Sequence, residues 1–420
     1  SESSTNVGTL TTAAKETLNG QESTTAFFAK LDELAAQSTS FKVPNTDKLY
    51  RIYFSRGNFS SAPTNAYADK NGTVQNGEGD TPDERLVKLV AETVQTPSAL
   101  VRFAKSGEGY TIQDVNSGQY YGFSYNGSDK LYTVPVTNQS GRGLYTIHNL
   151  FNGNPGNVAL QEHQCTDATK QYLWSCGSDA DEVVNHHPYV KFHSAYHDNA
   201  TTGDASTVEA GCVLTIKQVD TYPLTVSAAQ YASMCLPFSV TLPDGLTAYK
   251  VTGVNRSGNN EMTLVALGSS IAANEPVILA GTAGNYTLTI NAAESGTLNT
   301  DNILTGTSVP RQGIDDTYYA LAYKALDEND AENKTVGFFQ VTTSSMPANK
   351  AYLLKSKIPA ESHNAMALFF NFDGGQVTGI NQVDNGSASD NVYYDLNGHR
   401  VLYPSRGIYV KGNGQKVLIK

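Results

Sequence analysis

The stretch "YTIQDVNSGQYYG", residues 110–122, sets the interpretation of the first half of the chain. Its first Tyr and Ile lie two positions apart, so both side chains point to one face of a β-strand. "YRIYF" from Tyr50 and "YTIHNL" from Tyr145 begin in the same way, and "VLTIKQV" at residues 213–219 is suited to a closing strand. This three-fold recurrence predicts a β-trefoil over residues 47–220, with the three starting tyrosines at equivalent places.

The composition of the 420-residue chain suits many short strands. Charged residues make up 16% of it, against roughly 25% in an average soluble domain. The 36 Gly and 24 Tyr favour strands joined by tight turns. The net charge of −11 argues against nucleic acid or anionic lipid as a partner, because both require a basic face. No apolar stretch reaches the ~18 residues of a membrane span, so no span is expected.

One short helix is predicted in an N-terminal segment, residues 1–46. "ESTTAFFAKLDELAAQ" places apolar side chains at helical spacing, at Phe27, Phe28, Leu31, Leu34 and Ala35. The expected fold class is therefore mainly β: this helix, the β-trefoil, a β-sandwich-like domain and a small C-terminal β unit.

The prediction of the β-sandwich-like domain, residues 221–374, rests on a phrase that is written twice. "SSIAANEPVILAG" occupies residues 269–281, and "SSMPANKAYLLKS" occupies residues 344–356. Apolar strands surround both copies in a similar order, which indicates an internal pseudo-repeat. Two such halves suit one sandwich or barrel-like domain.

The doubled phrase is interpreted as a structural joint, with a binding loop used twice as the alternative. In each copy an apolar residue, Ile271 or Met346, is expected to enter the core. Ala and Asn then form a turn, because Asn tolerates the left-handed conformation expected at Asn274 and Asn349. Nothing in the phrase is nucleophilic, and it contains no pair of acids.

Two motifs within residues 47–220 resemble the ricin-type lectin trefoil. The turn "NSGQY", which begins at Asn116, is similar to the Asn-x-Gly turn that leads to Gln-Tyr in that family. "QYLW" is similar to its Gln-x-Trp motif, although here two residues separate Gln171 from Trp174. The resemblance implies a β-trefoil that binds carbohydrate.

The carbohydrate site that this resemblance implies consists of aromatic faces and polar side chains. Sugars stack on aromatic rings and exchange hydrogen bonds with amide and carboxylate groups. The candidates are Asp114, Asn116, Tyr120, Tyr121 and Trp174. The alternative for Tyr120 and Trp174 is that they cap the trefoil core.

The C-terminal residues, 375–420, resemble the sorting-type tail of secreted and surface proteins of Bacteroidetes. "YDLNGHRV", "GIYV" and "KVLIK" carry the likeness, and "LPFSVTLPDGLTAY" resembles a β-rich module of the same proteins. A polar linker is expected over residues 376–390. In the tail, two Asn-Gly pairs lie where two-residue hairpin turns belong. The resemblance implies a secreted or outer-surface location.

A metal site is a minor hypothesis, with His193 and His197 as candidate ligands and surface histidines as the alternative. No cofactor is expected. Cys165 and Cys176 are candidates for a disulfide, and the alternative is that the cysteines are buried free thiols.

The sequence favours a non-enzymatic protein that binds glycans or mediates adhesion. Acidic residues are scattered, and no nucleophile elbow, phosphate-binding loop or dinucleotide motif occurs. The partner would be a cell-surface carbohydrate, and a monomer is expected. Two alternatives stay open: an accessory portion of a larger exported enzyme such as a glycoside hydrolase, and a purely structural surface protein.

Overall fold

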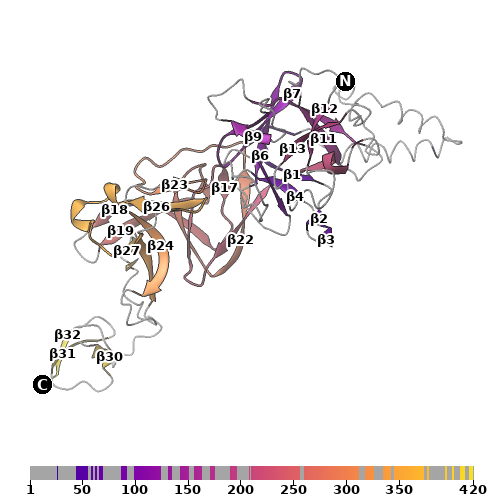
Figure 1. Ribbon diagram of the computed structural model, residues 1–420. Helices are drawn as coiled ribbons and strands as arrows, with labels where there is room; N and C mark the ends of the chain where they lie inside the picture. Colours follow the sequence, from indigo (N-terminus) through magenta and orange to yellow (C-terminus); the bar gives the residue numbers. More distant parts are fainter. Residues whose placement is uncertain are drawn as a thin grey trace, which may run out of the picture.

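The structure is a computed structural model, and it is mainly β (Figure 1). Ala26 is helical, and the rest of the predicted N-terminal helix lies outside the described residues. The described residues are 26, 44–54, 58–59, 62–63, 66–69, 87–91, 99–123, 131–134, 142–150, 156–162, 171–175, 190–195, 208, 210–255, 260–311, 317–325, 334–341, 345–372, 376–377, 393–394, 400–401, 407–411 and 416–419.

Six strands close a barrel in the first part of the chain. Each pairs antiparallel with two others in the cyclic order β1-β6-β7-β10-β11-β14, and β14 returns to β1. The closing strand lies within residues 213–219, as predicted. The six strands are β1 (Tyr50–Phe54), β6 (Val101–Ser106), β7 (Gly109–Asp114), β10 (Tyr145–Asn149), β11 (Asn157–Glu162) and β14 (Leu214–Gln218).

Three hairpins extend from alternate strands of this barrel. One is attached to β1, one to β7 and one to β11. A six-stranded barrel with three such hairpins has the strand order of a β-trefoil, so the predicted three-fold pattern is confirmed in the pairing. The hairpin strands are β4 (Ala66–Asp69), β5 (Lys88–Ala91), β8 (Tyr120–Phe123), β9 (Leu131–Val134), β12 (Gln171–Ser175) and β13 (Lys191–Ala195), and β2 (Asn58–Phe59) pairs with β3 (Ala62–Pro63).

The register corrects the predicted equivalence of the three tyrosines. Tyr50 lies opposite Val101, and Tyr110 lies opposite Tyr145. Tyr50 and Tyr110 are therefore equivalent, whereas Tyr145 corresponds to Val101. In β11 the equivalent place is taken by Val158. The expectation for Tyr145 was wrong because two strands of the second repeat both place a Tyr and an Ile on one face.

The second part of the chain forms a four-stranded sheet and a ten-stranded sheet. The smaller has the order β15-β22-β17-β20, and the larger has the order β16-β21-β18-β19-β27-β25-β24-β26-β23 with β28 beside β27. The strands are β15 (Thr221–Val226), β16 (Tyr231–Met234), β17 (Ser239–Thr241), β18 (Leu246–Asn255), β19 (Glu261–Ala266), β20 (Ser270–Ile271), β21 (Val277–Gly281), β22 (Gly284–Asn291), β23 (Thr305–Thr307), β24 (Tyr318–Ala325), β25 (Lys334–Val341), β26 (Lys350–Leu354), β27 (Ala367–Phe372) and β28 (Gln376–Val377).

The strand pairing shows both the pseudo-repeat and where it ends. β18 pairs with β19 and β21, and β24 pairs with β25 and β26 in the same arrangement. The last strands of the two halves differ. β22 pairs with β15 and β17, whereas β27 pairs with β25 and, in parallel, with β19. β27 therefore joins the two halves into one sheet.

Both turns of the doubled phrase have the predicted conformation. Asn274 and Asn349 have φ angles of 62° and 59°. Ile271 and Met346 are buried, with 2% and 6% of their surface exposed. The interpretation as a structural joint is confirmed for the backbone and the core residues.

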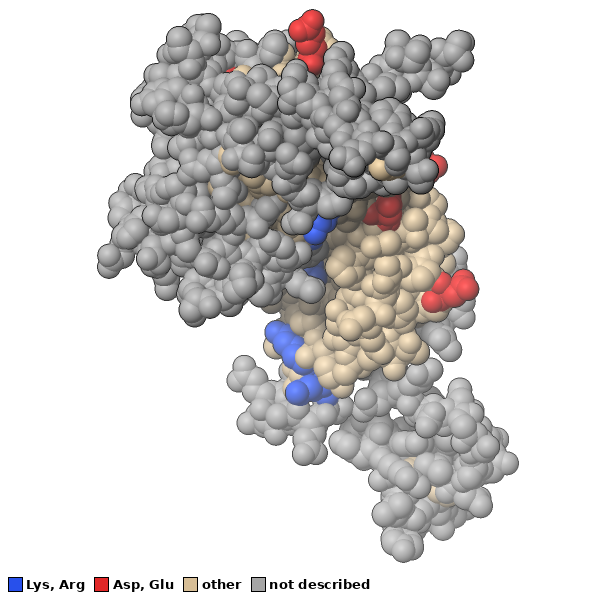
Figure 2. Space-filling view, turned by 90° about the vertical axis from the view of Figure 1, so that its right-hand side faces the viewer, with Lys and Arg blue, Asp and Glu red and all other residues tan. Residues whose placement is uncertain are grey.

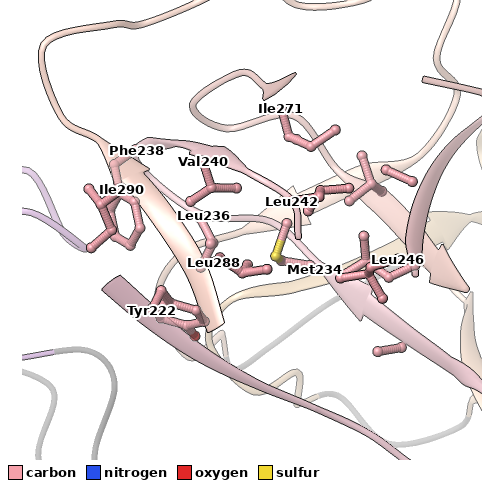
Figure 3. Packing of buried hydrophobic residues seen from close by; sticks show 14 of the residues in the cluster. Tyr222, Met234, Leu236, Phe238, Val240, Leu242, Leu246, Ile271, Leu288 and Ile290 are labelled. Carbon is pink, nitrogen blue, oxygen red and sulfur yellow. The ribbon is translucent and has the colours of Figure 1, made fainter. Parts of the chain in front are cut away.

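Buried apolar clusters fill the barrel and the second region. In one of them, shown in Figure 3, side chains from the first half of the pseudo-repeat point toward one another, including Met234, Leu236 and Leu288. Leu49 and Leu100, which directly precede the barrel strands β1 and β6, belong to the same cluster. The barrel is therefore packed against the second region through shared core residues.

Further short elements complete the described structure. The four C-terminal strands pair in the order β30-β29-β31-β32. These strands and the three short 3-10 helices are β29 (Tyr393–Tyr394), β30 (Arg400–Val401), β31 (Gly407–Lys411), β32 (Lys416–Ile419), η4 (Ala210–Cys212), η5 (Lys355–Lys357) and η6 (Ala360–Ser362).

Candidate functional site

The candidate site begins at the turn between β7 and β8, which holds the predicted lectin motif. Asp114 Oδ2 accepts a hydrogen bond of 2.7 Å from the Ser117 backbone N–H. The N–H of Gly118 donates to the Asp114 carbonyl at 2.9 Å, and Gly118 has a φ of 69° that suits glycine. Gln113 Nε2 donates to the Gly118 carbonyl at 2.8 Å. These bonds fix the turn in one conformation.

This turn is bonded to the second region through Asn116, which is 4% exposed. Asn116 Nδ2 donates to the Ser308 carbonyl at 2.9 Å, and Ser308 Oγ donates to the Asn116 carbonyl at 2.7 Å. Asn116 Nδ2 also lies 3.4 Å from Asn349 Oδ1, and Asn349 Nδ2 donates to the Tyr222 hydroxyl at 3.4 Å. Burial raises the pKa of Tyr222 to about 12, although the bond from Asn349 opposes the shift. Asn116 therefore helps to hold the two parts of the chain together.

A cleft of about 500 Å³ lies beside this junction. Residues of the turn form one wall, and segments around β17, β20 and β22 form the other. Its polar lining consists of Arg102, Gln113, Asn116, Ser117, Asn274, Glu294, Ser295 and Ser308. The structure thus combines the lectin-like turn with residues that lie far away in sequence.

The cleft is polar and carries one group of each charge. Arg102 and Glu294 are its charged side chains among the described lining residues. Arg102 Nη2 donates to the Ala292 carbonyl at 3.2 Å, which holds the guanidinium at the wall. Glu294 and Asn274 are exposed. Among the described lining residues, Glu294 supplies the carboxylate.

Figure 2 shows one face of the molecule, on which the described residues are mostly uncharged and their acidic and basic side chains are scattered.

The structure places two of the five predicted sugar-binding residues in the barrel core. Tyr121 and Trp174 are fully buried, with ring centroids 5.6 Å apart. Tyr145 meets the same indole at 5.3 Å. Burial, and then the charge of Asp114, raise the pKa of Tyr121 well above its usual range. A ring with no exposed face cannot stack on a sugar, so these two residues pack the core. For Trp174 this agrees with the alternative interpretation that it caps the trefoil core.

The other three predicted residues are dispersed. Asp114 is fully buried and bonded within its turn. Tyr120 is half-buried, and the Arg142 guanidinium lies 4.0 Å from its ring centroid. Of the five predicted residues, Asn116 lines the cleft. The sequence patterns did not identify Arg102, Asn274 and Glu294 as site residues. Only Asn274 belonged to a recognised pattern, the doubled phrase, and there its left-handed turn was interpreted as structural.

The hypothesis of a metal site falls on residues that the structure describes only in part. The backbone of His193 lies in β13 opposite Leu173, and His197 lies outside the described residues. Among the described residues, no cluster of three or more His, Cys, Asp or Glu side chains could hold a metal ion.

No helix formed by the described residues has the length and apolar character needed to cross a bilayer.

Cys212 and Cys235 are buried and form no disulfide, whereas Cys165 and Cys176 lie outside the described residues. Burial, with a smaller effect of the Glu275 charge, raises the pKa of Cys235 to about 12. The thiolate is the reactive form, so the raised pKa makes this thiol unreactive near neutral pH.

We expect iodoacetamide at pH 8 to modify Cys235 only after the protein unfolds. Mass spectrometry of peptides from native and urea-unfolded samples would measure this. Modification of Cys235 in the native protein, as fast as in the unfolded control, would contradict the buried position.

No family model matches this sequence. No curated protein matches it. A solved ricin B-like lectin from Macrolepiota procera, in complex with lactose, is similar at a TM-score of 0.28 and 13% identity, and the match covers 42% of this chain and 100% of that one. Cry35Ab1 is similar at 0.25 and 8%, over 74% and 88% of the two chains. A mosquitocidal holotoxin is similar at 0.28 and 10%, over 75% of this chain and 35% of its own. TM-scores this low carry no argument about a ligand or an activity.

Proposed function

We propose that this protein is a non-enzymatic carbohydrate-binding protein, secreted or attached to the outer surface of a cell, and that the cleft holds the glycan. The observation that supports this most directly is the chemistry of the cleft lining. It presents amides from Gln113 and Asn274, hydroxyls from serines, the Arg102 guanidinium and one carboxylate, Glu294. Sugar hydroxyls both donate and accept hydrogen bonds, so they are matched by such a mixture.

The same lining favours binding over catalysis. Among the described lining residues it has one carboxylate, whereas most glycosidases use two, one on each side of the scissile bond. Its aromatic member, Phe238, is buried at 2% exposure, so no ring is free to stack on the sugar from that position.

The location outside the cell is supported by the resemblance of residues 375–420 to a sorting-type tail.

Asn274 allows a sharp test of the cleft. Its side chain is exposed and its φ is 62°, so Asn274→Gly removes the amide but keeps the backbone conformation. A glycan array would select an oligosaccharide, and calorimetry would measure its affinity. We expect Asn274→Gly to weaken binding by about tenfold, because one hydrogen bond from the amide is lost.

Asn260 supplies the matched control, because it also has a left-handed backbone, with a φ of 56°, and is not among the cleft residues. Asn260→Gly should leave the affinity unchanged. Glu294→Gln should also weaken binding, since a charged acceptor is replaced by a neutral amide. The proposal fails if the array yields no ligand, or if both glycine variants bind equally well.

A further inference from the structure

A second groove, of about 400 Å³, lies in the larger sheet of the second region and is separate from the cleft. Consecutive residues of two strands line it: residues 231–233 of β16 and residues 320–323 of β24. Side chains alternate between the faces of a sheet, so a cavity on a face is lined by every second residue. Lining by consecutive residues shows that the groove faces the edges of both strands.

The backbone of β16 directs two residues toward this groove. In an antiparallel pair, the residues of one hydrogen-bonded pair turn both backbone groups to the partner strand, and the next residues turn theirs away. The Gly281 N–H donates to the Gln230 carbonyl, so Gln230 directs its backbone groups toward β21. Ala232, two positions later, directs its N–H and C=O groups the same way. Tyr231 and Ser233 therefore direct their N–H and C=O groups away from β21. The Cys235 N–H, on that outer side, reaches the Asn349 carbonyl at 3.3 Å.

β24 presents a similar edge from the other side. Its pairing with β26 ends at Ala320, opposite Tyr352. The Lys355 N–H donates to the Thr317 carbonyl, so every second residue from Thr317 onward faces the β26 side. Leu321 and Tyr323 belong to this set. The pairing of Ala320 with Tyr352 uses the Leu321 N–H as a donor to the Ala351 carbonyl, so the open edge of β24 within the described residues lies at Tyr323.

We propose that this groove binds an extended peptide segment of a partner protein, which adds as a strand to the edge of β24. The edge of β16 presents N–H and C=O groups at Tyr231 and Ser233, a spacing of about 7 Å, and the edge of β24 presents them at Tyr323. An extended polypeptide repeats complementary groups at that spacing. A sugar lacks such a repeat. The proposal is independent of glycan binding in the cleft.

The lining indicates the side chains of the partner peptide. Ala229, Ala232, Ala320, Ala322 and Ala351 are small and leave room for incoming side chains. Tyr323 is 53% exposed, so its ring can cover an apolar residue of the peptide. Lys350 is the charged residue of the described lining, which favours a peptide that carries a carboxylate.

The first part of the test measures amide exchange in the free protein. The N–H groups of Ala320 and Ala322 point to β25 and that of Leu321 points to Ala351 of β26, so these three should be protected, whereas that of Tyr323 should exchange quickly. Slow exchange at Tyr323 would overturn the proposal, because another segment or a second copy of the chain would then already cover the edge.

The second part uses a phage-displayed library of random octapeptides as the probe. Peptides enriched on the wild-type protein should protect the Tyr323 N–H from exchange. Tyr323→Pro removes an N–H that faces the groove and leaves the pairing with β25 intact. Tyr323→Ala keeps that N–H, so we expect it to bind the peptides about tenfold more tightly than Tyr323→Pro.

The outcomes separate clearly. No enrichment, or equal binding to the proline and alanine variants, overturns the proposal. If Tyr323→Pro does not fold, the exchange measurement on the wild-type complex decides alone: new protection at Tyr323 supports the proposal, and new protection elsewhere overturns it. Enriched peptides should contain Asp or Glu, and Lys350→Ala should weaken their binding.

Discussion

Trp174→Ala is expected to lower the free energy of unfolding of the barrel by about 3–5 kcal/mol. The indole is fully buried and meets Tyr121 and Tyr145 at centroid distances of 5.6 and 5.3 Å. Removing it would leave a cavity that the surrounding strands cannot fill, because the barrel is closed by pairing around its whole circumference. Urea unfolding followed by circular dichroism would measure the loss.

The control for this prediction is Trp174→Phe, which keeps an aromatic ring in the core. It should cost clearly less than Trp174→Ala, since much of the cavity stays filled. The wild-type fluorescence should also be blue-shifted, and glycans should not change it, because Trp174 is the single tryptophan of the chain and has no exposed surface. A red-shifted emission that responds to sugar would contradict the core position.

Asn349→Ala is expected to cost about 2–4 kcal/mol of stability, because two effects add. Asn349 has a φ of 59°, which strains an alanine at that position. Its buried amide also bonds the Tyr222 hydroxyl and lies beside Asn116 Nδ2. Without that amide, the Tyr222 hydroxyl would be buried without the one partner that the structure gives it.

Asn274→Ala provides the comparison, since it has the same turn but an exposed side chain. It should cost only the backbone strain, about 1 kcal/mol. Asn349→Gly removes the strain and should retain most of the loss that Asn349→Ala shows. Thermal unfolding of all three variants would test this, and equal losses for the two alanine variants would show that the buried amide contributes nothing.

Local patterns predicted the strands and turns because local chemistry controls them. A Tyr and an Ile two positions apart marked β1, β7 and β10, since period-two spacing places both on one face. Asn274 and Asn349 were predicted to be left-handed because Asn tolerates that conformation. The same spacing could not say which strand of a repeat carried it, and so Tyr145 was placed in the wrong equivalence.

The sequence by itself determined a mainly β chain, a three-fold barrel and two matching turns, because strand periodicity and turn chemistry act between near neighbours. Only the tertiary structure decided the fates of the candidate residues. Asn116 and Trp174 are both chemically suited to bind sugar, but one bonds Ser308 and the other is enclosed by the closed barrel. Likewise, Asn274 and Asn349 have the same local turn, yet one faces the cleft and the other is buried. Burial depends on which distant strands pack above a residue, and no local pattern records that packing.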